Sequence, residues 1–150
     1  MEQVTRAREL LGVPWVHQGR DPVSGIDCVG LLILAFQIHE PYVYGRHPHG
    51  GMIGKKLREH FGEPTLCAPE VGDVLELGFG TNGVGRHVAI VGDYAYGGLS
   101  LIHTDSVIGR VVELPLNDLW LRRIRAVYRK DIPDGATVAH NSWLMRNSNE

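Results

Sequence analysis

Apolar positions follow a helical pattern in two N-terminal segments. In residues 2–11 they repeat every three or four positions up to Gly12, which predicts a short amphipathic helix. Residues 28–38, CVGLLILAFQI, are apolar almost throughout and predict a helix that is buried on most sides. Asp27 directly precedes this run, where a carboxylate can cap the free N–H groups of a helix start. The segment between the two helices is rich in turn-forming residues.

From Gly72 onward the pattern changes to short segments typical of β-strands. The expected strands are DVLELGF, HVAIVGD, LSLIHTD, GRVVEL and LRRIRAVYRK, and turn-forming residues between them predict an antiparallel meander. A further short helix is expected around residues 53–61. Helices packed on an antiparallel sheet define an α+β fold. We expect one domain over residues 1–130 and a polar C-terminal tail over residues 131–150.

Composition and charge narrow the classes of function. The chain has 150 residues, 43% of them apolar, and a formal charge of −2, which suits one compact domain and gives no overall attraction to nucleic acid. No apolar run is long enough to span a bilayer, and the charges of Glu2, Arg6, Arg8 and Glu9 interrupt the stretch where a signal peptide would be apolar. We therefore expect a soluble protein without a cleavable signal that binds neither nucleic acid nor membrane.

Cys28 is the first candidate for chemistry, because it opens the predicted buried helix. Free N–H groups and aligned peptide dipoles at a helix start stabilise negative charge, so we expect the reactive thiolate to form more easily there. The same N–H groups could stabilise an oxyanion beside the sulfur. The alternative is that Cys28 is a buried small apolar residue without chemistry. Cys67, in a loop flanked by prolines, is expected to be inert.

Two histidines are predicted to face each other across a hairpin. His87 opens one expected strand, His103 lies in the next, and both are equally far along the chain from Ala95 in the loop between them. A hairpin symmetric about Ala95 would place the two imidazoles directly opposite each other on one face. Each histidine could instead be a structural residue. A cysteine at a helix start, a histidine base and a second orienting group form the arrangement that nucleophilic acyl transfer needs.

The motifs around these residues resemble the NlpC family of papain-like cell-wall cysteine peptidases. The run GIDCVGLL is similar to the family's nucleophile motif, VGDVLEL and RHVAIVGD to its Gly-Asp and His-containing strands, and LIHTD to the strand that holds a third polar residue. The upstream GVPWVHQGRDP is similar to the phage-encoded branch. The resemblance covers about residues 7–130. It implies a papain-like fold with Cys28 as nucleophile, His87 as general base and His103 as the orienting residue.

The resemblance also implies an activity and a set of substrate-binding positions. The activity is that of a cysteine endopeptidase or amidase, which hydrolyses peptidoglycan stem peptides through an acyl-thioester, typically at the bond following D-glutamate, with no cofactor and no metal. The positions for substrate or oxyanion contacts are Trp15, Asp27 and Val29, although Asp27 could equally serve as the helix cap. Trp15 stands where the family usually has Tyr, Val29 where it commonly has Ser, and Gln18-Gly19 where it has Gly-Gly.

The expected partners are peptidoglycan stem peptides and other phage tail proteins. With no signal sequence expected, we place the protein in a virion tail or in the cytoplasm of the phage-carrying host before release. The departures at Trp15 and Val29 motivate an alternative, in which the chain is a tail assembly protein that keeps the fold with weak or no activity. A third interpretation is a related acyltransferase, in which an amine or alcohol resolves the thioester.

Two further patterns in the sequence concern possible binding sites. His47 and His49 could begin a metal site, but no cysteine or acidic residue stands at ligand spacing nearby, so no metal is expected there. The last expected strand alternates basic with apolar residues, which predicts a solvated face or, alternatively, a patch for an anionic polymer. The basic residues of that face are Arg123, Arg125 and Arg129, and those of the apolar face are Ile124, Ala126 and Tyr128.

Overall fold

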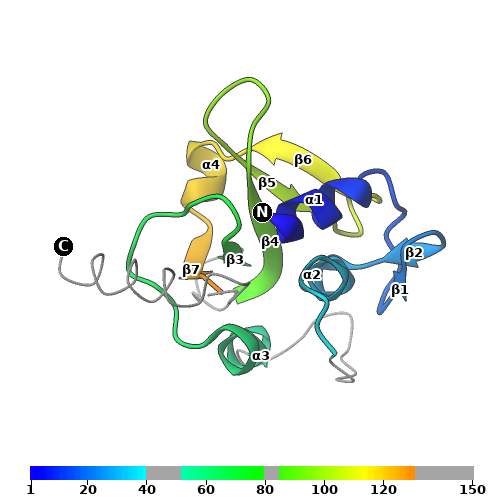
Figure 1. Ribbon diagram of the computed structural model, residues 1–150, viewed down its shortest axis with the longest axis horizontal. Helices are drawn as coiled ribbons and strands as arrows, with labels where there is room; N and C mark the ends of the chain where they lie inside the picture. Colours follow the sequence, from blue (N-terminus) through cyan, green and yellow to red (C-terminus); the bar gives the residue numbers. More distant parts are fainter. Residues whose placement is uncertain (40–51, 80–84, 131–150) are drawn as a thin grey trace.

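The computed structural model describes residues 1–39, 52–79 and 85–130. In these ranges three helices lie on one face of an antiparallel sheet, as the sequence predicted (Figure 1). The helices are α1 (Glu2–Glu9), α2 (Cys28–Phe36) and α3 (Met52–Phe61). No helix in the described ranges combines the length and the apolar character needed to cross a bilayer. The expected tail and the His47–His49 pair lie outside the described residues.

The sheet has the strand order β6-β5-β4-β3-β7. Its strands are β3 (Val74–Gly78), β4 (Gly85–Asp93), β5 (Leu99–His103), β6 (Val112–Pro115) and β7 (Ile124–Tyr128). The first four form the predicted meander, but β7 pairs with β3 at the opposite edge from β6. A short helix that the sequence analysis missed, α4 (Asp118–Leu121), connects β6 to β7. It begins after Asn117, whose side chain accepts a hydrogen bond from the amide of Trp120.

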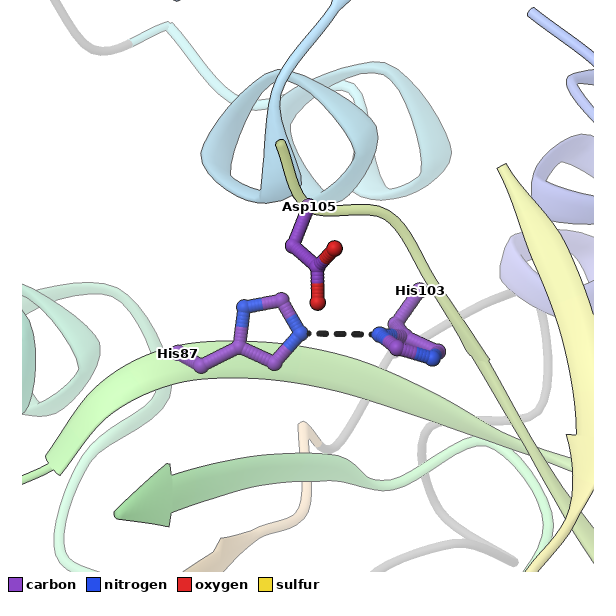
Figure 2. A group of neighbouring side chains, drawn as sticks. All are labelled: His87, His103 and Asp105. Atoms are coloured by element: carbon purple, nitrogen blue, oxygen red, sulfur yellow. Dashed lines mark hydrogen bonds between the residues drawn. The ribbon is translucent and has the colours of Figure 1, made fainter. Parts of the chain in front are cut away.

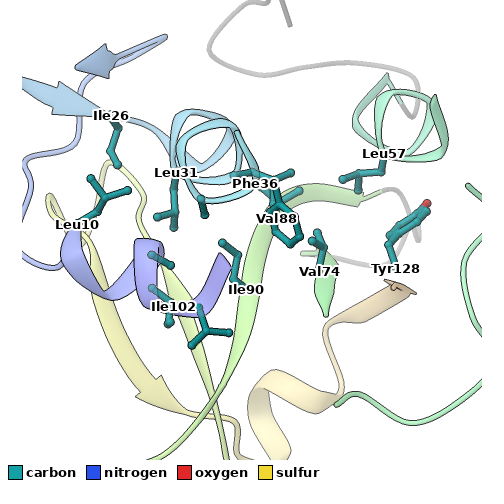
Figure 3. Close-up of a cluster of buried hydrophobic side chains, with 14 of the residues drawn as sticks. Leu10, Ile26, Leu31, Phe36, Leu57, Val74, Val88, Ile90, Ile102 and Tyr128 are labelled. Carbon is teal, nitrogen blue, oxygen red and sulfur yellow. The ribbon is translucent and has the colours of Figure 1, made fainter. Parts of the chain in front are cut away.

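The alternation of side chains along the strands produces two apolar clusters, one on each face of the sheet. On the helix face, residues of β3, β4, β5 and β7 pack against α1, α2 and α3 (Figure 3). The labelled members are Leu10, Ile26, Leu31, Phe36, Leu57, Val74, Val88, Ile90, Ile102 and Tyr128. On the other face a smaller cluster forms around Leu75, Leu77, Ala89, Val91, Leu101 and Val127, with Trp120 packed against it. The sheet is therefore buried on both sides.

A two-stranded hairpin, β1 (Arg20–Asp21) with β2 (Gly25–Ile26), precedes α2 in the segment expected only to turn. The start of this hairpin packs directly on α2. The carbonyl oxygen of Gly19, just before β1, lies so close to Gly30 that a Cβ atom there would collide with it. The glycine two residues after Cys28 thus allows the close approach that positions the start of α2.

The hairpin between β4 and β5 does not have the predicted register. Gly92 pairs with Ser100 and not with Gly98, so the connection is centred on Tyr96 instead of Ala95. The reason lies in the turn, where Gly97 and Gly98 both adopt positive φ and belong to the loop. Because side chains alternate with a period of two, this slip of two positions keeps the expected face but removes the direct cross-strand opposition of the histidines.

The arginines near the C-terminal end of the sheet do not form one solvated face. The pairing with β3 shifts at a bulge in β7, where Arg125 is the extra residue opposite Glu76 and Leu77. Ile124 therefore joins the cluster opposite the helices, while Ala126 and Tyr128 face the helices. The arginines have separate contacts. Arg129 binds both carboxylate oxygens of Asp73 at 2.9 Å, and Arg123 lies over the rings of Phe79 and Trp120.

Candidate active site

Asp27 fixes the start of α2. Its Oδ1 accepts a hydrogen bond from the amide of Gly30 at 2.8 Å, and its Oδ2 accepts one from the amide of Gln18 at 2.9 Å. The guanidinium of Arg20 lies 3.0 Å from Oδ1. Asp27 is buried, and both oxygens are engaged with the protein itself. Of the two roles considered for this residue, the structure shows the helix cap.

Cys28 is the first residue of α2 and is half-buried. Burial, and to a smaller extent the charge of Asp27, raise the pKa of its thiol to about 12, against the opposite effect of hydrogen bonds from the amides of Val88, Val29 and Cys28 itself. The helix start thus has the stabilising effect on the thiolate that the sequence predicted, but desolvation outweighs it. The raised pKa favours the neutral thiol at pH 7, contrary to the expectation of a readily formed thiolate.

The amide of Val88 reaches the thiol because β5 separates from β4 at this point. On β4 the amide of Val91 donates to the carbonyl of Asp73 on the β3 side, so by alternation the amide of Val88 points to the β5 side. The described ladder between β4 and β5 runs only from Asp93–Leu99 to Ile90–Ile102. Cys28, at the N-terminus of α2, therefore lies where β4 and β5 are no longer paired. It contacts the amide of Val88, the residue that follows His87 on β4.

His87 and His103 are in direct contact. Nε2 of His87 lies 2.9 Å from Nδ1 of His103, and the two rings meet edge-to-face with centroids 5.1 Å apart (Figure 2). Both residues are buried, His103 completely. The predicted meeting of the two imidazoles is confirmed, although they are diagonal neighbours and not an opposed pair.

Both imidazoles are held in their neutral form. Burial, and to a smaller extent the neighbouring His103, lower the pKa of His87 to about 3, against the opposite influence of the Asp105 carboxylate. Burial likewise lowers the pKa of His103, again against the influence of Asp105. A neutral imidazole with one free ring nitrogen can accept a proton, so the pair has the protonation state that a base requires.

Aromatic side chains that the sequence analysis did not assign to the site surround the histidines. Phe79 approaches His87 with ring centroids 6.2 Å apart, and Trp120 approaches His103 edge-to-face at 4.9 Å and 66°. Nε2 of His103 is buried and has no hydrogen-bond partner within the part of the chain that the structure describes. The apolar pattern of the strand at 73–79 was a signal for Phe79. Trp120 is brought in by the unpredicted α4, which no pattern indicated.

Asp105 is the other group at this site that the sequence analysis missed. One of its carboxylate oxygens points towards the two rings (Figure 2). Its Oδ1 accepts hydrogen bonds from the amides of Val107 at 2.9 Å and Ile108 at 2.7 Å. One ligand atom each from Asp105, His87 and His103 lies within 4.8 Å of the others, and such a set could hold a metal ion. The expectation of no metal did not consider this group.

Trp15 and Val29 lie on the segments that frame Cys28. Trp15 is half-buried, its amide donates to the carbonyl of Gly109 at 2.9 Å, and it forms a parallel bridge with Ile26. Val29 contributes its backbone amide to the sulfur of Cys28. Val29 therefore interacts with Cys28 through its main-chain N–H, which any residue other than proline supplies.

Comparison with solved structures identifies the architecture. The chain is similar to the NlpC/p60 domain of the peptidoglycan hydrolase SagA, with a TM-score of 0.56 and 23% identity over 85% of this chain and 96% of that chain. It is also similar to a lipoprotein-like protein of the NLP/P60 family from Staphylococcus aureus subsp. aureus Mu50, with a TM-score of 0.56 and 18% identity over 85% of this chain and 40% of that chain. No protein-family model and no curated protein matches the chain. The expected papain-like, NlpC-type fold is confirmed.

Proposed function

We propose that the protein is a cysteine peptidase that hydrolyses peptidoglycan stem peptides through an acyl-thioester. Cys28 is the nucleophile, His87 the general base and His103 the residue that orients the base. The observation that carries the proposal is the buried 2.9 Å contact between Nε2 of His87 and Nδ1 of His103. His87 directly precedes Val88, whose amide donates a hydrogen bond to the Cys28 thiol. Similarity to the NlpC/p60 domain of a peptidoglycan hydrolase supports the choice of substrate.

The proposed reaction requires a particular proton position on each ring. For His87 to accept a proton from Cys28 at Nδ1, its Nε2 must carry a proton and donate it to Nδ1 of His103. His103 then carries its own proton on Nε2, the buried nitrogen that points into apolar surroundings. The ring of Trp120, 4.9 Å away and edge-to-face, offers that N–H an aromatic acceptor. The aromatic environment thus favours the tautomer that leaves Nδ1 of His87 free.

The reaction begins from a neutral thiol and a neutral imidazole. As the sulfur attacks the carbonyl carbon of the scissile bond, its proton moves to Nδ1 of His87 and the carbonyl oxygen takes the negative charge. The amides at the start of α2 can donate to that oxyanion. His87 then gives the proton to the leaving amine, and the acyl-thioester remains. Water activated by His87 hydrolyses the thioester and restores the free thiol.

At Val29, where the sequence departs from the family pattern, the proposed mechanism needs only the main-chain amide. The amide of Val29 is available whatever its side chain, and Asp27 contributes by holding the helix start in place. Trp15 can donate a hydrogen bond from its indole N–H but cannot accept one. We assign Trp15 to the wall of the substrate site and Asp27 to positioning the nucleophile.

The finer proposal is that the hydrolase acts in a phage, from the virion tail or from the cytoplasm of the phage-carrying host, with other tail proteins as partners. It is supported only by the likeness of the N-terminal motif GVPWVHQGRDP to the phage-encoded branch. The rival function, a tail assembly protein with weak or no activity, is favoured by Trp15 and Val29, which replace residues that the family commonly uses.

The test is to incubate the full chain with purified muropeptides and to measure hydrolysis by the appearance of new amine termini. We expect release by the wild type, none by Cys28→Ala, and full release by Cys67→Ala, which changes the exposed cysteine instead. Absence of release by folded wild-type protein would favour the assembly role. Activity that persists in Cys28→Ala would remove Cys28 from the mechanism. A competing amine that becomes incorporated into the product, detected by mass spectrometry, would indicate an acyltransferase.

A further inference from the structure

The two histidines and Asp105 form a cluster of metal-binding groups inside the proposed active site. We propose that His87, His103 and Asp105 bind one zinc ion reversibly, and that the bound ion switches the hydrolase off. The binding itself is a property of these three residues. The inhibitory consequence rests on the proposed function.

The donor set matches the preferences of zinc. Two imidazole nitrogens and one carboxylate oxygen lie within 4.8 Å of one another, and zinc commonly takes three such protein ligands with water in the fourth position. With zinc bonds of about 2.0–2.1 Å, tetrahedral ligand atoms stand about 3.3 Å apart. The two ring nitrogens, now at 2.9 Å, must open by a few tenths of an ångström, and the carboxylate must move inward. Calcium and magnesium prefer oxygen ligands and do not suit this set.

The surroundings of the three groups hold them in place. The amides of Val107 and Ile108 both donate to Oδ1 of Asp105, which restrains the carboxylate while one oxygen points to the rings (Figure 2). His87 stands on β4, and His103 is the last residue of β5. Ligands supported by hydrogen bonds to their outer atoms and by rigid elements form better metal sites than mobile side chains. Asp105 is half-exposed, so this ligand is in contact with solvent while the two imidazoles are buried.

Zinc at this position would remove the base by changing its tautomer. A metal bound to Nε2 of His87 requires the lone pair of that nitrogen, so the ring proton must reside on Nδ1. Nδ1 is the atom that receives the proton of Cys28 in the proposed reaction. The ion also takes Nδ1 of His103, which breaks the contact that orients the base. The thiol then has no proton acceptor, and hydrolysis stops until the metal leaves.

The first test measures zinc binding to the metal-free full chain by calorimetry, without substrate. We expect one ion per chain at this site. Asp105→Asn keeps the oxygen that the two amides bind but loses the negative charge of a direct ligand. It should weaken binding by at least the ~10–100-fold that changes to the outer partners of ligands typically cost. His87→Gln should weaken it at least as much. Zinc should raise the melting temperature of the wild type more than that of Asp105→Asn, which shows the effect even if a variant is less stable.

Control variants separate this site from others. Cys28→Ala should bind zinc as the wild type does, because the thiol is not a ligand. The double variant His47→Ala/His49→Ala removes the other histidine pair that the sequence offers and should also bind normally. Loss of binding in that double variant, or no binding by the wild type, would overturn the proposed site.

The second test adds zinc during muropeptide hydrolysis. Zinc should inhibit the wild type, a chelator should restore activity, and magnesium should have no effect. Full activity at zinc concentrations that saturate the site would overturn the inhibitory step. If the wild type hydrolyses no muropeptide, the proposed function fails while calorimetry still decides whether the zinc site exists.

Discussion

A polar cluster lies towards each end of strands β4 and β5. The protein favours neutral groups in one cluster and charged groups in the other. At one end His87 and His103 contact each other in an apolar setting, and Nε2 of His103 has no hydrogen-bond partner among the described residues. Towards the other end, Arg8 of α1 bridges β4 and the edge strand β6. Its guanidinium binds both carboxylate oxygens of Glu113 at 3.1 and 2.9 Å and the carboxylate of Asp93 at 2.9 Å.

The two clusters differ in which charge state the protein favours. Hydrogen bonds to Glu113 and Asp93 raise the pKa of Arg8 above its ordinary value. Burial alone would raise the pKa of Glu113, but hydrogen bonds from Arg8 and Ser100 lower it below its usual range. At the histidine end, burial favours the neutral forms. One end is thus an ionised network with its groups paired, and the other is a pair of imidazoles that burial holds in the neutral form.

The largest expected difference between the two ends is in catalysis. His87→Gln should lower kcat/KM for muropeptide hydrolysis by about 10³-fold, within the range that a general base supplies. Glu113→Gln, on β6 with its side chain engaged by Arg8 and Ser100, should leave kcat/KM within about twofold, because it removes no contact of the two histidines. Steady-state assays of both variants measure the contrast. A comparable loss of activity in Glu113→Gln would show that the two ends are not functionally separate.

The next effect concerns the reactivity of the two thiols. Because burial raises the pKa of Cys28 to about 12, alkylation of Cys28 by iodoacetamide at pH 7.5 should be about 100-fold slower than alkylation of the exposed Cys67. The rate at Cys28 should rise steadily with pH beyond pH 9. Mass spectrometry of the labelled peptides separates the two sites. Faster labelling of Cys28 at neutral pH would mean that Cys28 and His87 already form an ion pair in the free protein.

The sequence predicted the elements well because their patterns are local. The helical spacing of residues 2–11 and the apolar run from Cys28 onward gave α1 and α2, and strand alternation gave the sheet. The pairing of the histidines survived an incorrect register, because a slip of two positions keeps a side chain on its face. The contact between His87 and His103 was therefore predicted without knowing how the hairpin turns.

The rest of the site depended on long-range placement that no local pattern records. The last described pair of β4 and β5 is Ile90 with Ile102. If this register continued, Asp105 would lie opposite His87, whereas the predicted hairpin symmetric about Ala95 places His103 there. Trp120 reaches His103 only because β7 pairs with β3 and α4 spans the sheet between them. The pKa of Cys28 was misjudged for a related reason. Desolvation depends on tertiary burial, which the sequence of the helix start does not show.

Acid should affect the histidine end before the ionised network. The folded state holds the pKa of His87 near 3, below the ordinary value of 6.5, so the unfolded chain binds this proton first. Stability is therefore retained above about pH 6.5 and lost as the pH falls towards 3. At pH 5 the loss from His87 alone should be about 2 kcal/mol of unfolding free energy. Urea unfolding at pH 7 and pH 5 measures it, and His87→Gln should show a correspondingly smaller loss. An equal loss in that variant would assign the acid sensitivity to other groups.

The smallest expected effect is on the stability supplied by the network itself. Glu113→Gln keeps the size of the side chain but removes the charge that pairs with Arg8 and accepts from Ser100. Because the Arg8 side chain is about one-third exposed, solvent screens the pair, and the loss at pH 7 should be only about 1 kcal/mol of unfolding free energy. Asp118→Asn, an exposed change on α4, serves as the matched control and should alter stability less. Since Asp93 still pairs with Arg8, Glu113→Gln combined with Asp93→Asn should lose more than either alone. Strict additivity of the two changes would mean that the carboxylates act on Arg8 independently and that the far end is two ion pairs instead of one network.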